Sequence, residues 1–494
     1  MDIDKQGIDD LNRLNYWRRY QSTLSFVLFM AVRKEFPKYR LRIEHSMSQG
    51  FYCYLDRPLK LKQVEKLKLR MRKIVWQNLP IRNFTIPVTQ AVCLFKKQGS
   101  IDKIELLRDC PVKTLRVSKL AGLFDAFGMP PLDSTGKAMF FDIRLFSPGF
   151  VLLFPFWQDL NAMAPYIPQL KLARIFNEYG EWVNILGVAD VADLNRAVEV
   201  SRGSEIIKVS EALHEKKIVY IADRITRGKR KIVLIAGPSS AGKTTFTKRL
   251  AIQLLVNELK PKIISVDDYF FPHCLTPRDE YGQLDFESIK AVDTALLNRH
   301  LEAVIQQHKV KMPRFNFIKG TRESGDTMFL PDNGVLLVEG IHCLNEELTY
   351  RIPKRVKFKI YISALTQLNI DDHNRISTTD TRTIRRLARD THYRGYSAQR
   401  VLSHWGKVRR GEERNIYPFQ EEADEMFNSA LIYEPSVLKE FCVPILRQIG
   451  SHDPTYPEAR RLLNYFSLFY HLPNRYVPSN SILREFIGGS SFVY

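Results

Sequence analysis

One octapeptide in the second half of the chain restricts the possible folds more than any other feature. Residues 237–244 read Gly-Pro-Ser-Ser-Ala-Gly-Lys-Thr and match the pattern G-x-x-x-x-G-K-[ST]. A β-rich run, IVLIA, precedes this segment, and a helix-compatible run, TTFTKRLAIQLL, follows its lysine. Loop amides and a helix N-terminus in this order attract an anion together. We therefore expect a phosphate-binding loop between a strand and a helix.

The residues of this loop have predicted roles in binding ATP and Mg²⁺, which are the expected cofactors. Lys243 is expected to reach the β- and γ-phosphates, and the Thr244 hydroxyl is expected to bind Mg²⁺. The predicted nucleotide-binding residues are Gly237, Pro238, Ser239, Ser240, Ala241, Gly242, Lys243, Thr244 and Thr245. The loop alone does not identify the phosphate acceptor, because hydrolases, GTP-dependent switches and small-molecule kinases share it.

Short β-rich runs alternate with longer helix-compatible stretches from Lys231 onward. The runs are IVLIA, KIISV, VLLVEG and FKIYISA. This alternation predicts an α/β fold in which helices flank a parallel sheet. The predicted divisions of the chain are an accessory α+β domain at 1–150, a helical connector at 151–225, the α/β domain at 226–450 and an extension packed on it at 451–494.

Acidic side chains follow two of these runs, at the edge of a parallel sheet where ligands bind. Asp267 and Asp268 follow KIISV, and Glu339 ends VLLVE. Asp267 is the candidate base for an attacking hydroxyl and a candidate metal ligand, and Glu339 is a candidate Mg²⁺ ligand. The alternatives are a capping role for Asp267 and a structural role for Glu339.

Arginines are concentrated between residues 376 and 395, on a helix-compatible stretch. They are Arg382, Arg385, Arg386, Arg389 and Arg394. Guanidinium groups can bind a transferring phosphoryl group through two hydrogen bonds each. We expect a basic lid in which Arg386 and Arg389 are catalytic; the alternative is a surface helix whose arginines pair with nearby acids.

Several ordered motifs between residues 228 and 435 resemble the uridine kinase and phosphoribulokinase branch of the P-loop kinases. They are GPSSAGKTTF, SVDDYF, TPRDEYGQLDFES, PRFNF, LLVEGIH, RRLARDTHYRG and ADEMFNSAL. The resemblance implies a P-loop NTPase fold and ATP-dependent phosphorylation of a nucleoside at its ribose 5′-hydroxyl. Uridine or cytidine is the expected substrate, and another sugar or a sugar phosphate is the alternative.

The resemblance also implies roles for individual residues. Asp267 falls on the catalytic aspartate and Glu339 on the magnesium-linked glutamate. The expected substrate-binding residues are Glu287, at the ribose hydroxyls, Phe315 and Phe317, at the base, and Arg394, which corresponds to a lid arginine like Arg386 and Arg389. In the chain, Gly320 replaces a histidine that bonds the pyrimidine in the animal enzymes, and Tyr396 replaces a further lid arginine, so base selectivity stays open.

The first third resembles a different family, the accessory editing-type domain of threonyl-tRNA synthetase. Residues ~20–110 carry the motifs FVLFMAVRKEFP, SQGFYCYL and LRMRKIVWQNLPI. Gln21 and Ser25 stand where the paired histidines of the HxxxH editing motif would be expected, so editing is not predicted. The union of the two parts resembles a bacterial family of long nucleoside kinases.

Local patterns in this first third predict a hairpin and a helix. Alternating apolar residues on both sides of Ser48-Gln49-Gly50 predict the hairpin over 40–55. Apolar residues at helical spacing over 64–75, with lysines and arginines between them, predict an amphipathic helix with a basic face.

Charge and cysteine usage bear on partners and location. The chain has a net charge of +20, and residues 1–150 hold 27 basic and 14 acidic side chains. A basic first third can attract RNA or tRNA, so an RNA-associated regulator that uses ATP as a switch is the rival function, and a homo-oligomer is left open. The six cysteines form no CxxC pair, and no signal peptide or membrane-spanning run is expected. These features predict a cytoplasmic protein.

Overall fold

The computed structural model describes residues 5–108, 110, 112–279, 282–366 and 368–493. These residues form two compact units that interleave along the chain. Unit 1 comprises Met1–Ile207, Leu365–Gly406 and Ile432–Tyr476, and unit 2 comprises Lys208–Ala364, Lys407–Leu431 and Val477–Tyr494. The units group segments by packing and do not test the four predicted domains, which stay predictions.

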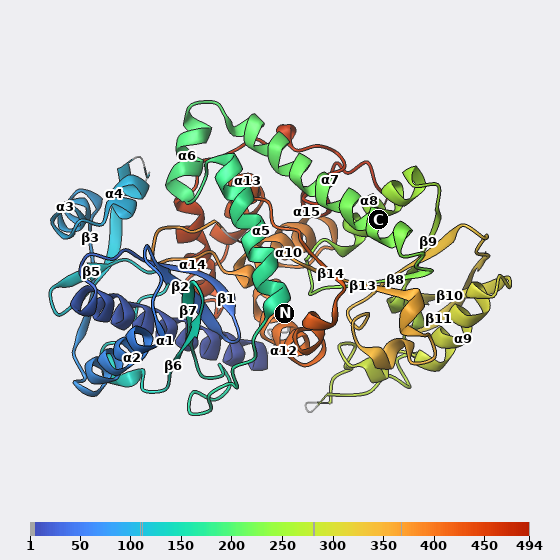
Figure 1. Cartoon of the computed structure of the whole chain (residues 1–494), viewed down its shortest axis with the longest axis horizontal. Coiled ribbons are helices and arrows are strands. Elements are labelled where there is room, and N and C mark those ends of the chain that lie inside the picture. The colour runs from blue at the N-terminus through green and yellow to red at the C-terminus, as the bar shows by residue number, and fades with distance from the viewer. Residues whose placement is uncertain (1–4, 109, 111, 280–281, 367, 494) are drawn as a thin grey trace. The chain divides into compact units, whose positions relative to one another are not determined.

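Unit 2 is built on a five-stranded sheet in which every strand pair is parallel (Figure 1). In spatial order the strands are β14 (Glu425–Asn428), β13 (Lys357–Ser363), β8 (Ile232–Ala236), β12 (Gly334–Glu339) and β9 (Lys260–Ser265). β8 and β13 are buried along their whole length, as parallel strands covered on both faces are. The predicted parallel α/β sheet is confirmed, and four of its strands are the four β-rich runs of the sequence.

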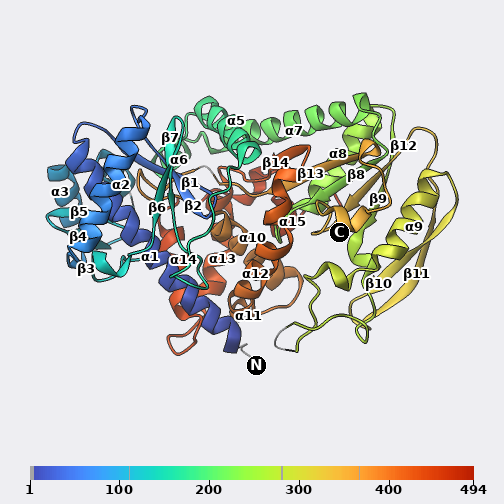
Figure 2. The same cartoon turned by 60° about the horizontal axis from the view of Figure 1, so that its bottom comes forward.

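Helices and a hairpin complete unit 2. The helix that follows the phosphate-binding loop, α8 (Lys243–Val256), contacts β8, β9 and β12. The antiparallel hairpin of β10 (Val310–Asn316) and β11 (Thr321–Met328) lies beside α9 (Thr294–Ile305) (Figure 2). The other helices with residues in this unit are α7 (Gly203–Arg227), α12 (Trp405–Asn415) and α15 (Arg484–Ile487).

Unit 1 contains two antiparallel sheets. One has the order β1 (Leu41–Met47), β2 (Gly50–Leu55), β7 (Gly149–Leu153) and β6 (Asp142–Phe146), and the other β3 (Ile81–Pro87), β4 (Thr114–Leu120) and β5 (Leu123–Asp125). The predicted hairpin is confirmed as β1 and β2, and Ser48 and Gln49 in its turn both have positive φ angles. β7 begins before residue 151, so the first residues of the predicted helical connector belong instead to the N-terminal sheet.

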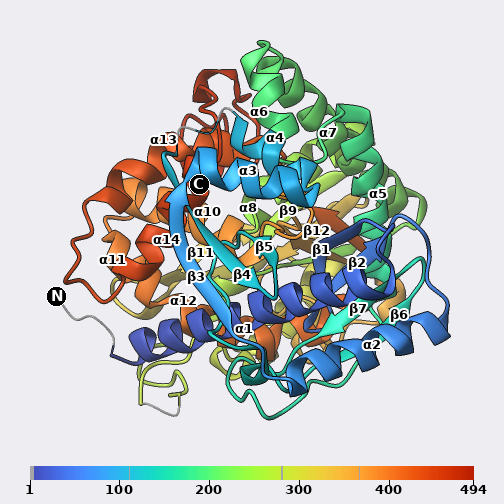
Figure 3. The same ribbon diagram turned by 90° about the vertical axis from the view of Figure 1, so that its left-hand side faces the viewer.

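The predicted amphipathic helix is confirmed as α2 (Leu61–Trp76), which runs beside α1 (Lys5–Glu35) (Figure 3). Its apolar stripe is buried, as the periodicity predicts. On the basic face, Lys66 pairs with Glu35 and Lys68 with Asp142. Part of the positive charge on this helix is therefore already balanced within unit 1.

The remaining α-helices of unit 1 are distributed over its three segments. They are α3 (Val88–Gln98), α4 (Ile101–Arg108), α5 (Leu170–Leu186), α6 (Val191–Glu199), α10 (Thr378–Tyr393), α11 (Ala398–Ser403), α13 (Glu434–Arg447) and α14 (Tyr456–Ser467). No helix among the described residues is long and apolar enough to cross a membrane.

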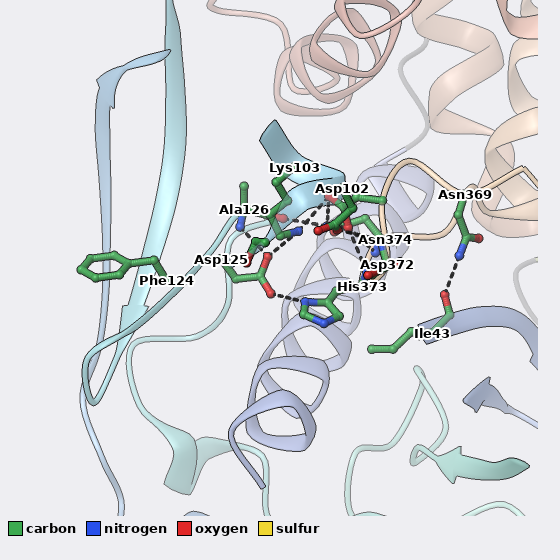
Figure 4. A network of polar contacts seen from close by, with 12 residues as sticks. Ile43, Asp102, Lys103, Phe124, Asp125, Ala126, Asn369, Asp372, His373 and Asn374 are labelled. Atoms are coloured by element: carbon green, nitrogen blue, oxygen red, sulfur yellow. Dashed lines mark hydrogen bonds and ion pairs between the residues drawn. The ribbon is translucent and has the colours of Figure 1, made fainter. Parts of the chain in front are cut away.

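A buried polar network joins the N-terminal part of unit 1 to the segment that leads into α10 (Figure 4). Lys103, which is 2% exposed, places its Nζ 2.7 Å from Asp125 Oδ1 and 2.8 Å from Asp371 Oδ2. Asp102 accepts a hydrogen bond from the backbone N–H of Asp372. Arg40 donates two hydrogen bonds to the Asp372 carboxylate, at 2.5 and 2.9 Å. Residues far apart in the sequence are thus joined by the buried charges of Lys103, Asp125 and Asp371 and by the more exposed Arg40 at the edge of the network.

His373 belongs to the same network. Its Nδ1 lies 2.7 Å from Asp125 Oδ2, and its ring packs on Phe29 with the ring centroids 4.3 Å apart. Burial lowers the pKa of His373, but the Asp125 carboxylate outweighs burial, and the pKa is raised above its ordinary value. The imidazole is therefore held in its charged form more strongly in the folded protein than in the unfolded chain.

Replacement of Lys103 by methionine is expected to destabilise unit 1 by about 3–5 kcal/mol, because it removes the lysine cation from Asp371 and leaves buried Asp125 with His373 alone. Urea unfolding followed by circular dichroism measures the change. Lys97→Met, on the exposed face of α3, is the matched control and is expected to change stability by less than about 0.5 kcal/mol. Equal effects of the two substitutions would contradict this role of Lys103.

The pH dependence of stability is expected to change when His373 is replaced by glutamine. A raised folded-state pKa contributes stability that is fully present below the unfolded pKa of about 6.5 and is lost as the pH rises through the folded value. The difference in unfolding free energy between pH 6 and pH 8.5 should therefore be larger in the wild type than in His373→Gln. Parallel pH curves for the two proteins would show that His373 does not carry this dependence.

Candidate phosphate-transfer site

The phosphate-binding loop follows β8 and depends on two of its glycines. A Cβ at Gly237 would collide with the backbone carbonyl oxygen of Ile362 in the neighbouring strand β13. Gly242 has a φ of +85°, and a Cβ there would also collide with the Ile482 side chain. Both positions therefore require glycine, for close backbone approach in one case and for a left-handed conformation in the other.

Lys243 begins α8 and turns back over the loop. Its Nζ donates hydrogen bonds to the carbonyl oxygens of Gly237 at 2.9 Å and Pro238 at 3.2 Å. The ammonium group is held beside the loop backbone by these bonds. A lysine in this position can bind phosphate as a point charge.

Glu339 lies at the carboxyl end of β12, next to the loop helix. The hydroxyls of Thr244 and Thr247 donate to its two carboxylate oxygens, each at 3.4 Å. The pKa of Glu339 is raised above its ordinary value, chiefly by burial. The Lys243 ammonium opposes this rise, and the Glu485 and Asp267 carboxylates add to it. A partly buried carboxylate surrounded by other carboxylates has a strong affinity for a cation.

Asp267 lies in the 3₁₀ turn Val266–Tyr269 that directly follows β9. Its side chain reaches the solvent, but its pKa is raised above the ordinary value, chiefly because surrounding protein atoms displace water from the carboxylate. The Asp268 carboxylate adds to this rise, and the Lys243 ammonium opposes it. Asp268 is held differently, because its Oδ1 accepts a hydrogen bond from the backbone N–H of Phe315 at 3.1 Å. This bond gives Asp268 a bracing role on β10 and favours Asp267 as the reactive carboxylate.

The predicted metal ligands suit Mg²⁺ in kind. Thr244, Glu339 and Asp267 offer one hydroxyl and two carboxylates, and Mg²⁺ prefers a few such oxygens together with water and substrate phosphates. Within the described ranges, no group of three or more histidine, cysteine, aspartate and glutamate side chains is arranged to hold a metal ion by itself.

The predicted aromatic pair belongs to a larger cluster in unit 2. The centroids of Phe315 and Phe317 are 5.0 Å apart, and Phe270 and Phe286 continue the cluster. Phe315 is 5% exposed, whereas Phe317 is 58% exposed. Phe315 is thus part of the core, and Phe317 offers a ring face to solvent.

His273 joins this cluster, at the place where Gly320 departs from the animal enzymes. Its ring lies against Phe286, with centroids 5.5 Å apart, and its backbone N–H donates to Gly320 O at 3.0 Å. A Cβ at Gly320 would collide with the imidazole of His273. His273 therefore occupies the space into which a side chain at 320 would project. The sequence analysis missed this residue because it lies 47 positions away in the chain.

Glu287 directly follows Phe286 of the aromatic cluster and packs against α12. A Cβ at Gly411 would lie 2.8 Å from Glu287 Cγ and 2.9 Å from Oε2. The next residue of α12, Glu412, accepts a hydrogen bond from the backbone N–H of Ser239 at 3.1 Å. The sequence analysis missed both α12 residues, because no motif signals them.

A second missed acid, Glu485, comes from the C-terminal segment of unit 2. Its Oε2 accepts hydrogen bonds from the Thr245 hydroxyl at 2.7 Å and from the Thr245 backbone N–H at 3.2 Å. Thr245, predicted to bind nucleotide, therefore has its hydroxyl engaged by the protein.

The predicted lid arginines lie on α10, in unit 1. Arg386 and Arg389 place their Nε atoms 3.0 and 2.8 Å from the buried carboxylate of Asp390, and the Nε of exposed Arg394 lies 3.7 Å from it. Three guanidinium groups share one carboxylate, so the cluster keeps a net positive charge. The other two arginines are buried: Arg385 pairs with Glu434 in the core, and Arg382 lies over Trp405. The contacts of the three outer arginines with Asp390 also suit the alternative of pairing with a nearby acid, and the lid role stays a prediction.

Comparison with known proteins supports both resemblances. Residues 232–431 match the Phosphoribulokinase / Uridine kinase family. This range spans the sheet of unit 2, from β8 to the end of β14, and α10 of unit 1. The predicted resemblance of this region to the family is confirmed.

The curated relatives divide along the chain in the same way. Uridine kinase from Borrelia garinii subsp. bavariensis is 29% identical over 196 residues, which are 39% of this chain and 84% of that protein. Uridine kinase from Deinococcus deserti is 27% identical over 174 residues, or 35% of this chain and 75% of that protein. Threonine–tRNA ligase from Acetivibrio thermocellus is 30% identical over 127 residues, and the match covers 25% of this chain and only 20% of that protein.

Two solved structures each match 42% of this chain, with low TM-scores. A possible uridine kinase from Bacillus stearothermophilus is 17% identical, with a TM-score of 0.28 over 42% of this chain and 97% of that one. A putative fructose transport system kinase from Silicibacter sp. TM1040 is 16% identical, with a TM-score of 0.31 over 42% of this chain and 98% of that one. These scores are too low to carry an argument, and the fold assignment rests on the strand order.

Proposed function

We propose that this protein is an ATP-dependent nucleoside kinase that transfers the γ-phosphate to the ribose 5′-hydroxyl of uridine or cytidine. The observation that carries the proposal is the arrangement at one edge of the sheet. The adjacent strands β8, β12 and β9 end in the phosphate-binding loop, Glu339 and the turn of Asp267, and Lys243 acts electrostatically on both carboxylates. A phosphate loop beside a candidate base is what transfer to a hydroxyl requires.

Each group has a proposed part in the reaction. Lys243 and the loop amides hold the phosphates, and Thr244, Glu339 and Asp267 would hold Mg²⁺, which supplies neutralisation of phosphate charge when bound. Asp267 accepts the proton of the attacking hydroxyl, for which its raised pKa makes it a better base than an ordinary aspartate. Arg386 and Arg389 are proposed to stabilise phosphoryl charge, as the family resemblance implies.

The acceptor is proposed to bind near Glu287 and the aromatic cluster. Glu287 would accept hydrogen bonds from ribose hydroxyls, and the exposed face of Phe317 can stack on a base. The imidazole of His273 would supply the base contact that Gly320 cannot make. An aromatic cluster with an exposed ring favours a nucleoside over a plain sugar or sugar phosphate, because neither of those carries an aromatic base that could stack on it.

The rival function, an ATP-switched RNA regulator, rests on the basic first third and on the similarity to threonine–tRNA ligase. Gln21 and Ser25 are buried within α1, and two α2 lysines are already paired with acids. RNA contact and a homo-oligomer stay predictions, and we favour the kinase.

Asp267→Asn is expected to lower kcat by about 10²–10⁴-fold, because it removes the proposed base while keeping the shape of the side chain. Incubation of the protein with Mg²⁺-ATP and uridine or cytidine, followed by mass spectrometry of ADP and the phosphorylated nucleoside, measures the effect. Asp326→Asn on β11, an exposed position, is the control. Release of ADP without a phosphorylated acceptor would favour the ATP-switch rival.

If His273 contacts the base, moving the histidine from position 273 to position 320 should preserve much of that contact. His273→Ala is expected to raise the KM for uridine by about tenfold, the cost of about one lost hydrogen bond. The double variant His273→Ala/Gly320→His should recover much of this loss, because histidine tolerates the positive φ at position 320 better than most residues. Exposed His308→Ala is the control. An unchanged KM in His273→Ala would exclude His273 from the acceptor site.

A further inference from the structure

A carboxylate from α12 is bound to the phosphate-binding loop. The backbone N–H of Ser239, the third residue of the loop, donates to Glu412 Oε1 at 3.1 Å. The Tyr417 hydroxyl donates to the other oxygen, Oε2, at 3.0 Å. Glu412 is 1% exposed. It is therefore a built-in part of unit 2, held from two sides.

This contact uses a donor that a phosphate would also use. Consecutive N–H groups of such a loop attract anions, and here the chain supplies one of its own. The Ser239 N–H has a single proton, so a phosphate oxygen that accepts it must displace the Glu412 oxygen. The two anions would also repel each other in surroundings with little water.

Helix α12 contacts the proposed acceptor segment at the same time. Gly411 lies against Glu287, as described above. Lys407, one turn earlier, lies 3.2 Å from Asp279 and donates to Gln283 at 2.9 Å. One short helix thus contacts the phosphate-binding loop and also Asp279, Gln283 and Glu287.

We propose that Glu412 is a displaceable internal anion that competes with ATP for the Ser239 amide. The inference rests on the proposed function and adds a means of regulating it. Binding of ATP breaks the hydrogen bond between Ser239 and Glu412 and releases the carboxylate. α12 then conveys this change to the segment that carries Glu287, so that nucleotide binding and the acceptor side of the site are linked.

The opposite role for Glu412 is a brace that holds the loop in the shape ATP needs. The two roles make opposite predictions for affinity. If Glu412 competes with phosphate, an uncharged replacement tightens ATP binding. If it is a brace, the same replacement weakens binding.

Isothermal titration of the full chain with Mg²⁺-ATP distinguishes the two roles. Glu412→Gln keeps the shape of the side chain and removes its charge, and it is expected to lower the Kd for ATP by about fivefold, the difference between a charged and a neutral hydrogen bond. Glu413→Gln is the matched control on the same helix, because Glu413 pairs with Arg409. It should leave the Kd unchanged.

A second variant tests the hydrogen bond that the Tyr417 hydroxyl donates to the Glu412 carboxylate. Tyr417→Phe removes only the hydroxyl, so it should tighten ATP binding by about twofold. In the Glu412→Gln background the same substitution should have no further effect, since the charge it restrained is gone.

The possible outcomes test the competing-anion role of Glu412 separately from the proposed kinase function. If the wild type binds ATP and Glu412→Gln binds it equally or more weakly, the competing-anion role is wrong and the kinase proposal stands. If the wild type does not bind ATP, both are wrong. Tighter binding in Glu412→Gln and Tyr417→Phe, without additivity in the double variant, supports the inference.

Discussion

The close approach of Gly237 to the backbone of Ile362 is the constraint on which the candidate site depends. It lets the chain leave β8 beside the neighbouring strand β13 and curl into the phosphate-binding loop. Because β8, β12 and β9 are parallel neighbours, their carboxyl ends lie at one edge of the sheet. The parallel order of these strands brings the loop, Asp267 and Glu339 together, although more than a hundred residues separate the start of the loop at Gly237 from Glu339.

Charge balance shapes the site once these groups are assembled. The surrounding protein and the neighbouring carboxylates raise the pKa of both Asp267 and Glu339, although the Lys243 ammonium acts in the opposite direction. Two more acids, Glu412 and Glu485, accept hydrogen bonds from Ser239 and Thr245. An acidic set of this kind around a phosphate-binding loop suits a reaction in which Mg²⁺ accompanies the nucleotide.

The helix that carries the predicted lid arginines, α10, is part of unit 1. α10 packs within unit 1, and the segment just before it is anchored by Lys103, Asp125 and His373 (Figure 4). The part of the chain that resembles a tRNA synthetase domain is thereby joined to the helix that carries the proposed phosphate-binding arginines. This gives the N-terminal part a structural task that needs no catalytic residues of its own.

The sequence by itself determined the phosphate-binding loop, the parallel α/β class, the β1–β2 hairpin and the apolar stripe of α2, because these depend on local patterns. It also placed Asp267 and Glu339 at the carboxyl ends of strands, because strand ends can be read from the sequence, while their roles in the reaction stay predictions. Tertiary structure alone decided that Arg382 and Arg385 are core residues, that His273 fills the space beside Gly320, and that Glu412 contacts Ser239. These contacts join residues that are distant in sequence and carry no pattern, so only packing could bring them to light.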